Sequence, residues 1–132
     1  MSMQVCYSVH ISNVGWTSAW CNSTILGDYH DQIEAIEMVV SPDVGSVGYQ
    51  AHVENIGWQG MKYNGQMAGT QGQHLRMEAI TMGLYNNPNK DFIVYNVYLP
   101  DYGGWQYRSE NRQQAGTTGL SEPITALWID IT

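Results

Sequence analysis

Aromatic and amide side chains dominate the chemistry that this sequence offers. It contains nine Tyr and five Trp, while only 13% of its residues are charged. A Trp can stack its flat face against the C–H face of a sugar while its indole N–H donates a hydrogen bond, and Asn, Gln and Thr bind hydroxyl groups. The composition is typical of a surface that binds neutral, hydrogen-bonding ligands.

Catalytic motifs are absent from the sequence. No Ser or Cys lies in a nucleophile elbow, no phosphate-binding Gly-rich loop opens a helix, and no His pair has the spacing of a zinc-binding helix. Asp28, His30 and Asp31 could together reach a cation, but no further ligand is specified, so we expect a solvated acidic turn. We predict a protein that is not an enzyme and that uses no metal or cofactor.

Charge and hydropathy restrict the possible partners. Five basic residues against 12 acidic ones give a net charge of −7, which repels a phosphate backbone. No run approaches the roughly 18 apolar residues of a membrane span, and the first residues do not resemble a signal peptide. We expect no nucleic-acid binding and no membrane insertion, in a protein that is either cytosolic or excised from a longer secreted or surface chain.

The sequence repeats itself. VCYSVHISNVGW, from Val5, aligns without a gap on VGYQAHVENIGW, from Val47, so that His10 matches His52, Asn13 matches Asn55 and Trp16 matches Trp58. A weaker third copy contains Trp105 and Ala115-Gly116-Thr117, which matches Ala68-Gly69-Thr70, and it has Tyr98 or a neighbour at the histidine position. The 132 residues therefore form one domain of three units: unit one (about 4–40), unit two (46–84) and unit three (92–131).

The units read as strands. In unit two, Tyr49, Ala51 and Val53 alternate with polar residues, and Asn64-Gly65 is a strong signal for a tight hairpin. We expect about four strands in each unit and an all-β domain with a pseudo-threefold axis, because three units can bury together an apolar face that one cannot. The short QMAGT strand favours a β-trefoil, with a β-prism as the alternative. Two cysteines, Cys6 and Cys21, leave open whether they are bonded.

Unit two closely resembles the clostridial hydrophobic repeat with its Gly-Trp, the ChW repeat. The matching elements are Tyr49, His52-Val53, Asn55, Gly57-Trp58, Asn64-Gly65, Ala68-Gly69-Thr70, Gly72, Arg76 and Glu78-Ala79-Ile80. Such repeats often come in threes on surface or secreted bacterial proteins and are thought to bind polysaccharide or other surface ligands. The resemblance thus implies a binding module, with carbohydrate as the leading ligand class.

Several residues are candidates for ligand contact. Each Trp of the Gly-Trp pairs is either core or binding surface, and each His is expected to be half-buried and hydrogen-bonded within its own unit. Arg76 and Glu78 are expected to share one strand face as an internal ion pair. The loop that begins at Gly69 is polar and follows a strand, as functional loops on β scaffolds often do. The candidate ligand-binding residues are Trp16, Trp58, Trp105, Asn13, Asn55, His10, His52, Gly69, Thr70 and Gln71.

We therefore predict a carbohydrate-binding protein, either a lectin or a cell-surface module that binds glycans or cell-wall polysaccharide. Its sites are expected to be individually weak and to act together through avidity, and oligomers are possible. The alternative is a protein-interaction or adhesin module that binds no sugar.

Overall fold

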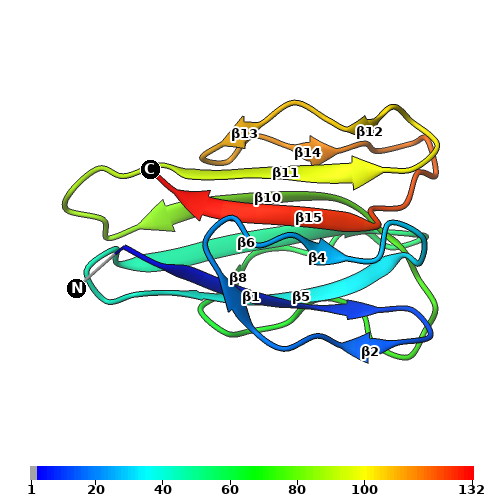
Figure 1. Cartoon of the computed structure of the whole chain (residues 1–132), viewed down its shortest axis with the longest axis horizontal. Coiled ribbons are helices and arrows are strands. Elements are labelled where there is room, and N and C mark those ends of the chain that lie inside the picture. The colour runs from blue at the N-terminus through cyan, green and yellow to red at the C-terminus, as the bar shows by residue number, and fades with distance from the viewer. Residues whose placement is uncertain (1–2) are drawn as a thin grey trace.

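The computed structural model describes residues 3–132, and every regular element in this range is a β-strand (Figure 1). Within this range no helix is present that could span a membrane. Unit one forms β1 (Val5–Ile11), β2 (Gly15–Trp16), β3 (Trp20–Cys21), β4 (Leu26–Gly27) and β5 (Ile33–Val40). Unit two forms β6 (Ser46–Val53), β7 (Gly57–Trp58), β8 (Lys62–Tyr63), β9 (Ala68–Gly69) and β10 (Met77–Tyr85). Unit three forms β11 (Ile93–Leu99), β12 (Gly104–Trp105), β13 (Ser109–Glu110), β14 (Ala115–Gly116) and β15 (Ala126–Ile131).

Each unit builds one sheet around its two long strands. The long pairs β1–β5, β6–β10 and β11–β15 are antiparallel, and two short strands of the same unit lie along the first long strand. Burial alternates strictly along β1, as the sequence pattern predicts for a strand with one face toward a core. Three sheets of five strands each are compatible with the expected pseudo-threefold, all-β domain.

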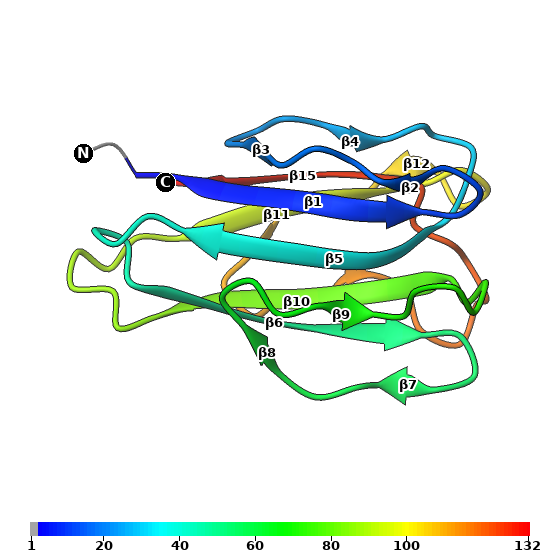
Figure 2. The ribbon, with the colours of Figure 1, turned by 90° about the horizontal axis from the view of Figure 1, so that it is seen from below.

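The turns and the termini lie at opposite ends of the domain. The long strands all follow the long axis (Figures 1 and 2). The connections β1–β2, β6–β7 and β11–β12 gather at one end, whereas both termini and the unit junctions at 41–45 and 86–92 lie at the other (Figures 1 and 2). Equivalent turns of the three units are therefore neighbours in space.

The predicted hairpin in unit two is confirmed. Asn64 and Gly65 both have positive φ, at 24° and 82°, and the amide of Gln66 donates to the carbonyl of Tyr63 across the turn. The count of strands was underestimated, because each unit has five rather than about four. The extra elements are two-residue strands, which are too short to give an alternating pattern in the sequence.

The fifth strand of every sheet comes from a different unit. β4 of unit one pairs with β15 of unit three, β9 of unit two pairs with β5 of unit one, and β14 of unit three pairs with β10 of unit two. Each exchanged strand ends in a glycine with positive φ. A side chain on Gly69 would overlap the carbonyl oxygen of Glu34, so the close approach of the two backbones requires glycine.

A buried tyrosine joins each unit to the next in the same order. Tyr7, Tyr49 and Tyr95 are at most 1% exposed, and each hydroxyl donates to a carbonyl of its own unit, at Thr24, Gln66 and Gln113 respectively. The same oxygen accepts a backbone N–H of the neighbouring unit, from Ile129 (3.1 Å), Met38 (3.4 Å) and Met82 (3.3 Å) respectively. Burial raises the pKa of Tyr7 and of Tyr95 to about 12.

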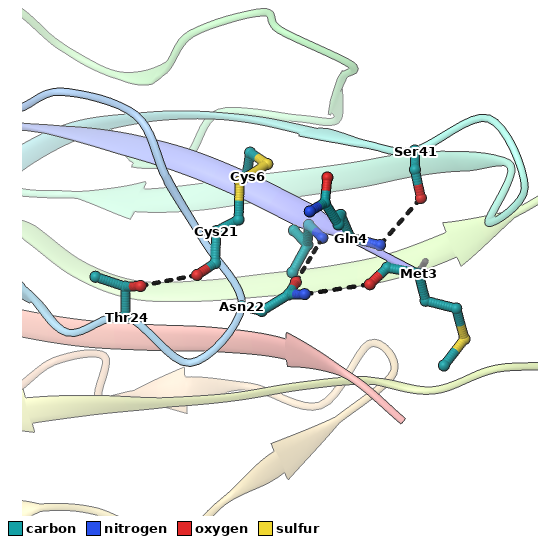
Figure 3. The surroundings of a disulfide bond; sticks show 8 residues. Met3, Gln4, Cys6, Cys21, Asn22, Thr24 and Ser41 are labelled. Carbon is teal, nitrogen blue, oxygen red and sulfur yellow. Dashed lines mark hydrogen bonds between the residues drawn. A yellow bond between two sulfur atoms is a disulfide. The ribbon is translucent and has the colours of Figure 1, made fainter. Parts of the chain in front are cut away.

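Cys6 and Cys21 form a disulfide that joins β1 to β3 (Figure 3). The two residues are directly opposite each other in the strand register, with a Cα–Cα distance of 4.0 Å. Beside them the side-chain oxygen of Asn22 accepts the amide of Val5 at 2.9 Å. Asn64 and Asn111 make the same bond in the other units, so the asparagine is structural and the disulfide is an addition to unit one.

Replacement of Tyr49 by Phe should lower the free energy of unfolding by about 1–3 kcal/mol, because the amide of Met38 and the carbonyl of Gln66 lose a buried partner. Urea denaturation followed by circular dichroism measures the change. The matched control is Tyr107→Phe, since Tyr107 is 95% exposed and should leave stability unchanged. Equal stability of the two variants would contradict the bridging role of Tyr49.

Stability should also fall as pH rises from about 10 to about 12. The folded state holds the protons of Tyr7 and Tyr95 up to a pKa of about 12, while the unfolded chain releases them near 10.0, so deprotonation favours unfolding in this window. Urea unfolding at pH 8, 10, 11 and 12 measures the slope, which should be shallower for Tyr7→Phe. A free energy of unfolding that stays constant over this range would show that these hydroxyls do not titrate with unfolding.

The disulfide should be detectable and stabilising. In denaturant without reductant we expect no reactive thiol, and two after reduction. The double variant Cys6→Ser, Cys21→Ser should lose about 3 kcal/mol, since the bond closes a loop with a sequence separation of 15. Thiol titration and urea denaturation give the two results, and free thiols in the unreduced protein would contradict the bond.

Candidate functional site

Each unit packs its Gly-Trp tryptophan edge-on against an aromatic ring of its own first long strand. The Trp on the short strand lies directly opposite this ring in the strand register. Ring centroids are 5.3–5.5 Å apart and the ring planes cross at 73–79°. The pairs are His10–Trp16 in site one, His52–Trp58 in site two and Tyr98–Trp105 in site three, and we call these the tryptophan sites.

The tryptophans lie at the surface and not in the core. Trp58 is 39% exposed, and Trp16 and Trp105 are half-buried. Tyr7, Tyr49 and Tyr95 are the aromatic residues of the threefold core. The tryptophans of the three Gly-Trp pairs are therefore not part of the core.

A buried carboxylate orients each histidine. Nδ1 of His10 lies 3.1 Å from Glu34 Oε1, and Nδ1 of His52 lies 3.0 Å from Glu78 Oε1. With these carboxylates ionised, Nδ1 donates and Nε2 of a neutral ring is left as an acceptor. The histidines are half-buried and bonded within their own units, as predicted.

The carboxylate of site two is part of a longer ion-pair network. Arg76 donates through Nε to Glu78 at 2.9 Å, which confirms the expected pair, and its Nη1 lies 2.9 Å from Glu54. In site one Gln32 replaces the arginine and donates to Glu34 at 3.4 Å. Site three has Thr125 in place of the glutamate. The three sites therefore share their aromatic pair but differ in charge.

The strand exchange brings a loop from another unit to two of these sites. Nε1 of Trp16 donates to Oε1 of Gln71, from unit two, at 3.2 Å. Tyr29, from unit one, packs against Tyr98 at 4.8 Å and against Trp105 at 6.1 Å between ring centroids. Sites one and three are thus composite.

The loop that begins at Gly69 contributes to the site of another unit. β9 pairs with β5, which carries Gln71 to Trp16 of unit one. Gly69 and Thr70 are buried, Gly69 as the close backbone contact and Thr70 as an amide donor to the carbonyl of Glu34 at 3.0 Å. Of the three candidate residues at 69–71, Gln71 is the exposed one.

The asparagines at the bend have a backbone role. Asn13 and Asn55 are exposed and have φ values of 67° and 65°, in the turns between β1 and β2 and between β6 and β7. Asparagine tolerates this left-handed conformation better than most residues. The turn conformation explains why an asparagine recurs at this position. Both asparagines are nevertheless exposed and lie close in sequence to the Trp of the same unit.

The indole N–H groups differ between the sites. Trp16 donates to Gln71, whereas Trp58 and Trp105 have no hydrogen-bond partner among residues 3–132. The hydroxyl oxygens of Thr70 and Thr117 are buried and likewise have no protein partner. A free indole N–H on a partly exposed ring is a donor that suits a hydroxylated ligand.

Tyr98 occupies the histidine position of unit three, as expected, because it pairs with Trp105 as His52 pairs with Trp58. Sequence reasoning missed Glu34 and Tyr29. Glu34 had a usable signal, because it aligns with Glu78 in the first two units. Tyr29 had none, since its partner lies in the unit that is farthest away along the chain.

The acidic turn at 28–31 is closed by its own hydrogen bonds. Partial burial alone would raise the pKa of Asp28, but its carboxylate accepts the amides of Asp31 (2.7 Å) and His30 (2.9 Å), and the pKa is lowered. Across residues 3–132 no group of three or more His, Cys, Asp or Glu side chains is placed to hold a metal ion.

A comparison with known protein families finds a match within unit two. The family model described as Clostridial hydrophobic W, ChW, matches residues 52–86. This part of unit two is similar to the ChW repeat. The matched ChW segment contains His52, Trp58, Arg76 and Glu78, which build site two, and it also contains the exchanged strand β9. No curated protein and no solved structure matched the chain.

Proposed function

We propose that the protein is a non-catalytic carbohydrate-binding module that uses its tryptophan sites as weak, repeated contacts for glycans. The observation that supports this proposal is a Trp ring held edge-on by its neighbour and partly exposed in all three units. A ring oriented by one perpendicular neighbour, and partly exposed, can meet the C–H surface of a sugar. It also loses little conformational entropy on binding.

Polar groups around each ring suit sugar hydroxyls. In site two the indole N–H of Trp58 is free to donate, and Nε2 of His52 is free to accept when Nδ1 donates to Glu78. The glutamate is 7% exposed and is already bonded to both His52 and Arg76, so it acts by orienting the histidine. This arrangement binds and orients a ligand without an obvious acid or base for cleavage.

The three sites should differ in preference. Site two combines the most exposed of the three site tryptophans with a charged network. Site three surrounds Trp105 with Tyr29 and Tyr98 and has no histidine or glutamate at the equivalent positions. In site one the indole N–H already bonds to Gln71, so a ligand must compete for it. Binding to a polymer through several unequal sites gives avidity without strong individual contacts.

The same proposal includes the finer fold class. The sheets are separate, and each is built on long strands of 6 to 9 residues. Three separate sheets of long strands around one axis support the β-prism alternative over the β-trefoil, whose long strands would pair from one unit to the next. The short strands β4, β9 and β14 are the strands that one unit contributes to the sheet of another.

A surface polysaccharide is the proposed partner. The net charge of −7 disfavours nucleic acid, and the ChW resemblance implies ligands at bacterial surfaces. A neutral polymer suits the aromatic and amide groups of the sites.

A glycan array compared across four proteins tests the proposal. Trp58→Ala and Trp105→Ala should each weaken binding about tenfold, or about 1.4 kcal/mol, relative to wild type. Trp20→Ala is the matched control, since Trp20 is 56% exposed, lies on β3 and makes no contact with a tryptophan site. Circular dichroism of each variant separates lost binding from lost folding.

The outcome decides between the candidate functions. Equal binding by Trp58→Ala, Trp105→Ala and Trp20→Ala would reject the tryptophan sites. Absence of any glycan signal together with stoichiometric binding of one protein would favour an adhesin. Release of reducing ends from a polysaccharide would overturn the non-catalytic assignment.

A further inference from the structure

A hollow of about 390 Å³ is formed by the junction between units two and three and by the turn after β13. This junction lies at the other end of the domain from the connections that lead into β2, β7 and β12 (Figures 1 and 2). Its lining combines aromatic rings, amides and two cations, among them Tyr85, Asn86, Lys90, Phe92, Asn111 and Arg112. The volume is near the lower end of the range for small-molecule sites, about 300–1,000 Å³.

Two paired glycines make room for the side chains at its edge. Gly48 and Gly83 are opposite each other in β6 and β10. A Cβ on Gly48 would lie 2.7 Å from the ring of Tyr85, and one on Gly83 would lie 3.0 Å from Cγ of Arg112. The equivalent pairs are Cys6–Val39 in unit one and Val94–Asp130 in unit three. The space is therefore specific to unit two.

Arg112 is held across this space. Its guanidinium carbon lies 4.8 Å from the centroid of the Tyr85 ring, and its Nε donates to the Tyr85 hydroxyl at 3.4 Å. Tyr63 packs edge-on against Tyr85, with centroids 5.9 Å apart. Tyr85, itself packed against Tyr63, therefore orders the Arg112 side chain. The other N–H groups of the guanidinium are left to bind a ligand.

The backbone of Arg112 is unfavourable for an arginine. Its φ is 67°, and Gly65 occupies the same position of the hairpin turn in unit two. A residue with a side chain costs about 1 kcal/mol in this left-handed conformation relative to glycine. The turn after β13 thus places a cation where glycine would be more stable.

The hollow also collects unpaired positive charge in an acidic protein. Of the five basic residues, Arg76 and Arg108 form ion pairs with glutamates. Lys90 and Arg112 both line the hollow, and neither has a carboxylate partner among the described residues. The one carboxylate of the lining, Asp91, accepts the side-chain amide of Asn87 at 2.9 Å. Two cations therefore face one engaged carboxylate.

We propose that this hollow binds a carboxylate-bearing sugar, of the uronic acid class, as a site separate from the tryptophan sites. The ligand carboxylate lies between Arg112 and Lys90, and the side-chain amide N–H groups of Asn86 and Asn111 meet its hydroxyls. Phe92, which is 49% exposed, supplies an apolar face for the sugar ring.

Titration with free glucuronate, followed by amide NMR shifts, tests the proposal. Glucuronate should shift the signals of Phe92, Asn111 and Arg112, whereas glucose and acetate should each bind at least tenfold more weakly. Arg112→Gly should weaken glucuronate binding at least tenfold while the midpoint of urea unfolding stays equal or rises. The matched control is Arg108→Gln, which removes the same charge from an exposed ion pair of unit three and should bind as wild type.

A second variant and two control measurements complete the test. If Arg112→Gly does not fold, Lys90→Gln must show the same loss. Glucuronate binding that survives both substitutions, or acetate binding as tight as that of glucuronate, overturns the proposal. Trp58→Ala should bind glucuronate as wild type does, so failure on the glycan array and failure at this hollow are separate results.

Discussion

The fold depends on the bond that each buried tyrosine makes to the backbone of the next unit. One hydroxyl satisfies a carbonyl of its own unit and an amide of its neighbour, at a place where no solvent could replace either bond. The exchanged strands follow the same cyclic order, so side-chain and backbone contacts reinforce one another. Each sheet takes strands from two units, so the three sheets are all complete only when all three units are present.

This constraint decides where the binding chemistry can change. Because site one takes Gln71 from unit two and site three takes Tyr29 from unit one, a substitution in one unit can alter the ligand preference of another. The residues of the exchanged strands, such as Gly69, are fixed by close contact with the backbone of the neighbouring unit. Exposed positions next to the rings are free to vary, which explains how three units with one architecture have different polar surroundings.

Much of the architecture could be predicted from sequence, since the repeat of Gly-Trp, the alternation in β6 and the turn at Asn64-Gly65 are local signals. The pairing of β9 with β5 is not local. Nothing in Ala68-Gly69 states which sheet it joins, so the contact of Gln71 with Trp16 could not be predicted. The hollow at Arg112 was missed for the opposite reason. It depends on Gly48 and Gly83, whose meaning appears only when the two strands are seen side by side.

The exchange of short strands has a consequence for any unit considered alone. A single unit would have a short strand with no neighbouring sheet to join, and its own sheet would have an unpaired edge. Unpaired strands and edges of this kind lead to domain swapping and edge-to-edge association. Three separate copies of one unit could satisfy these needs by assembling around the same axis. The protein is thus the single-chain equivalent of a swapped trimer. The junctions at 41–45 and 86–92 join the three units covalently, so the units do not have to meet by diffusion.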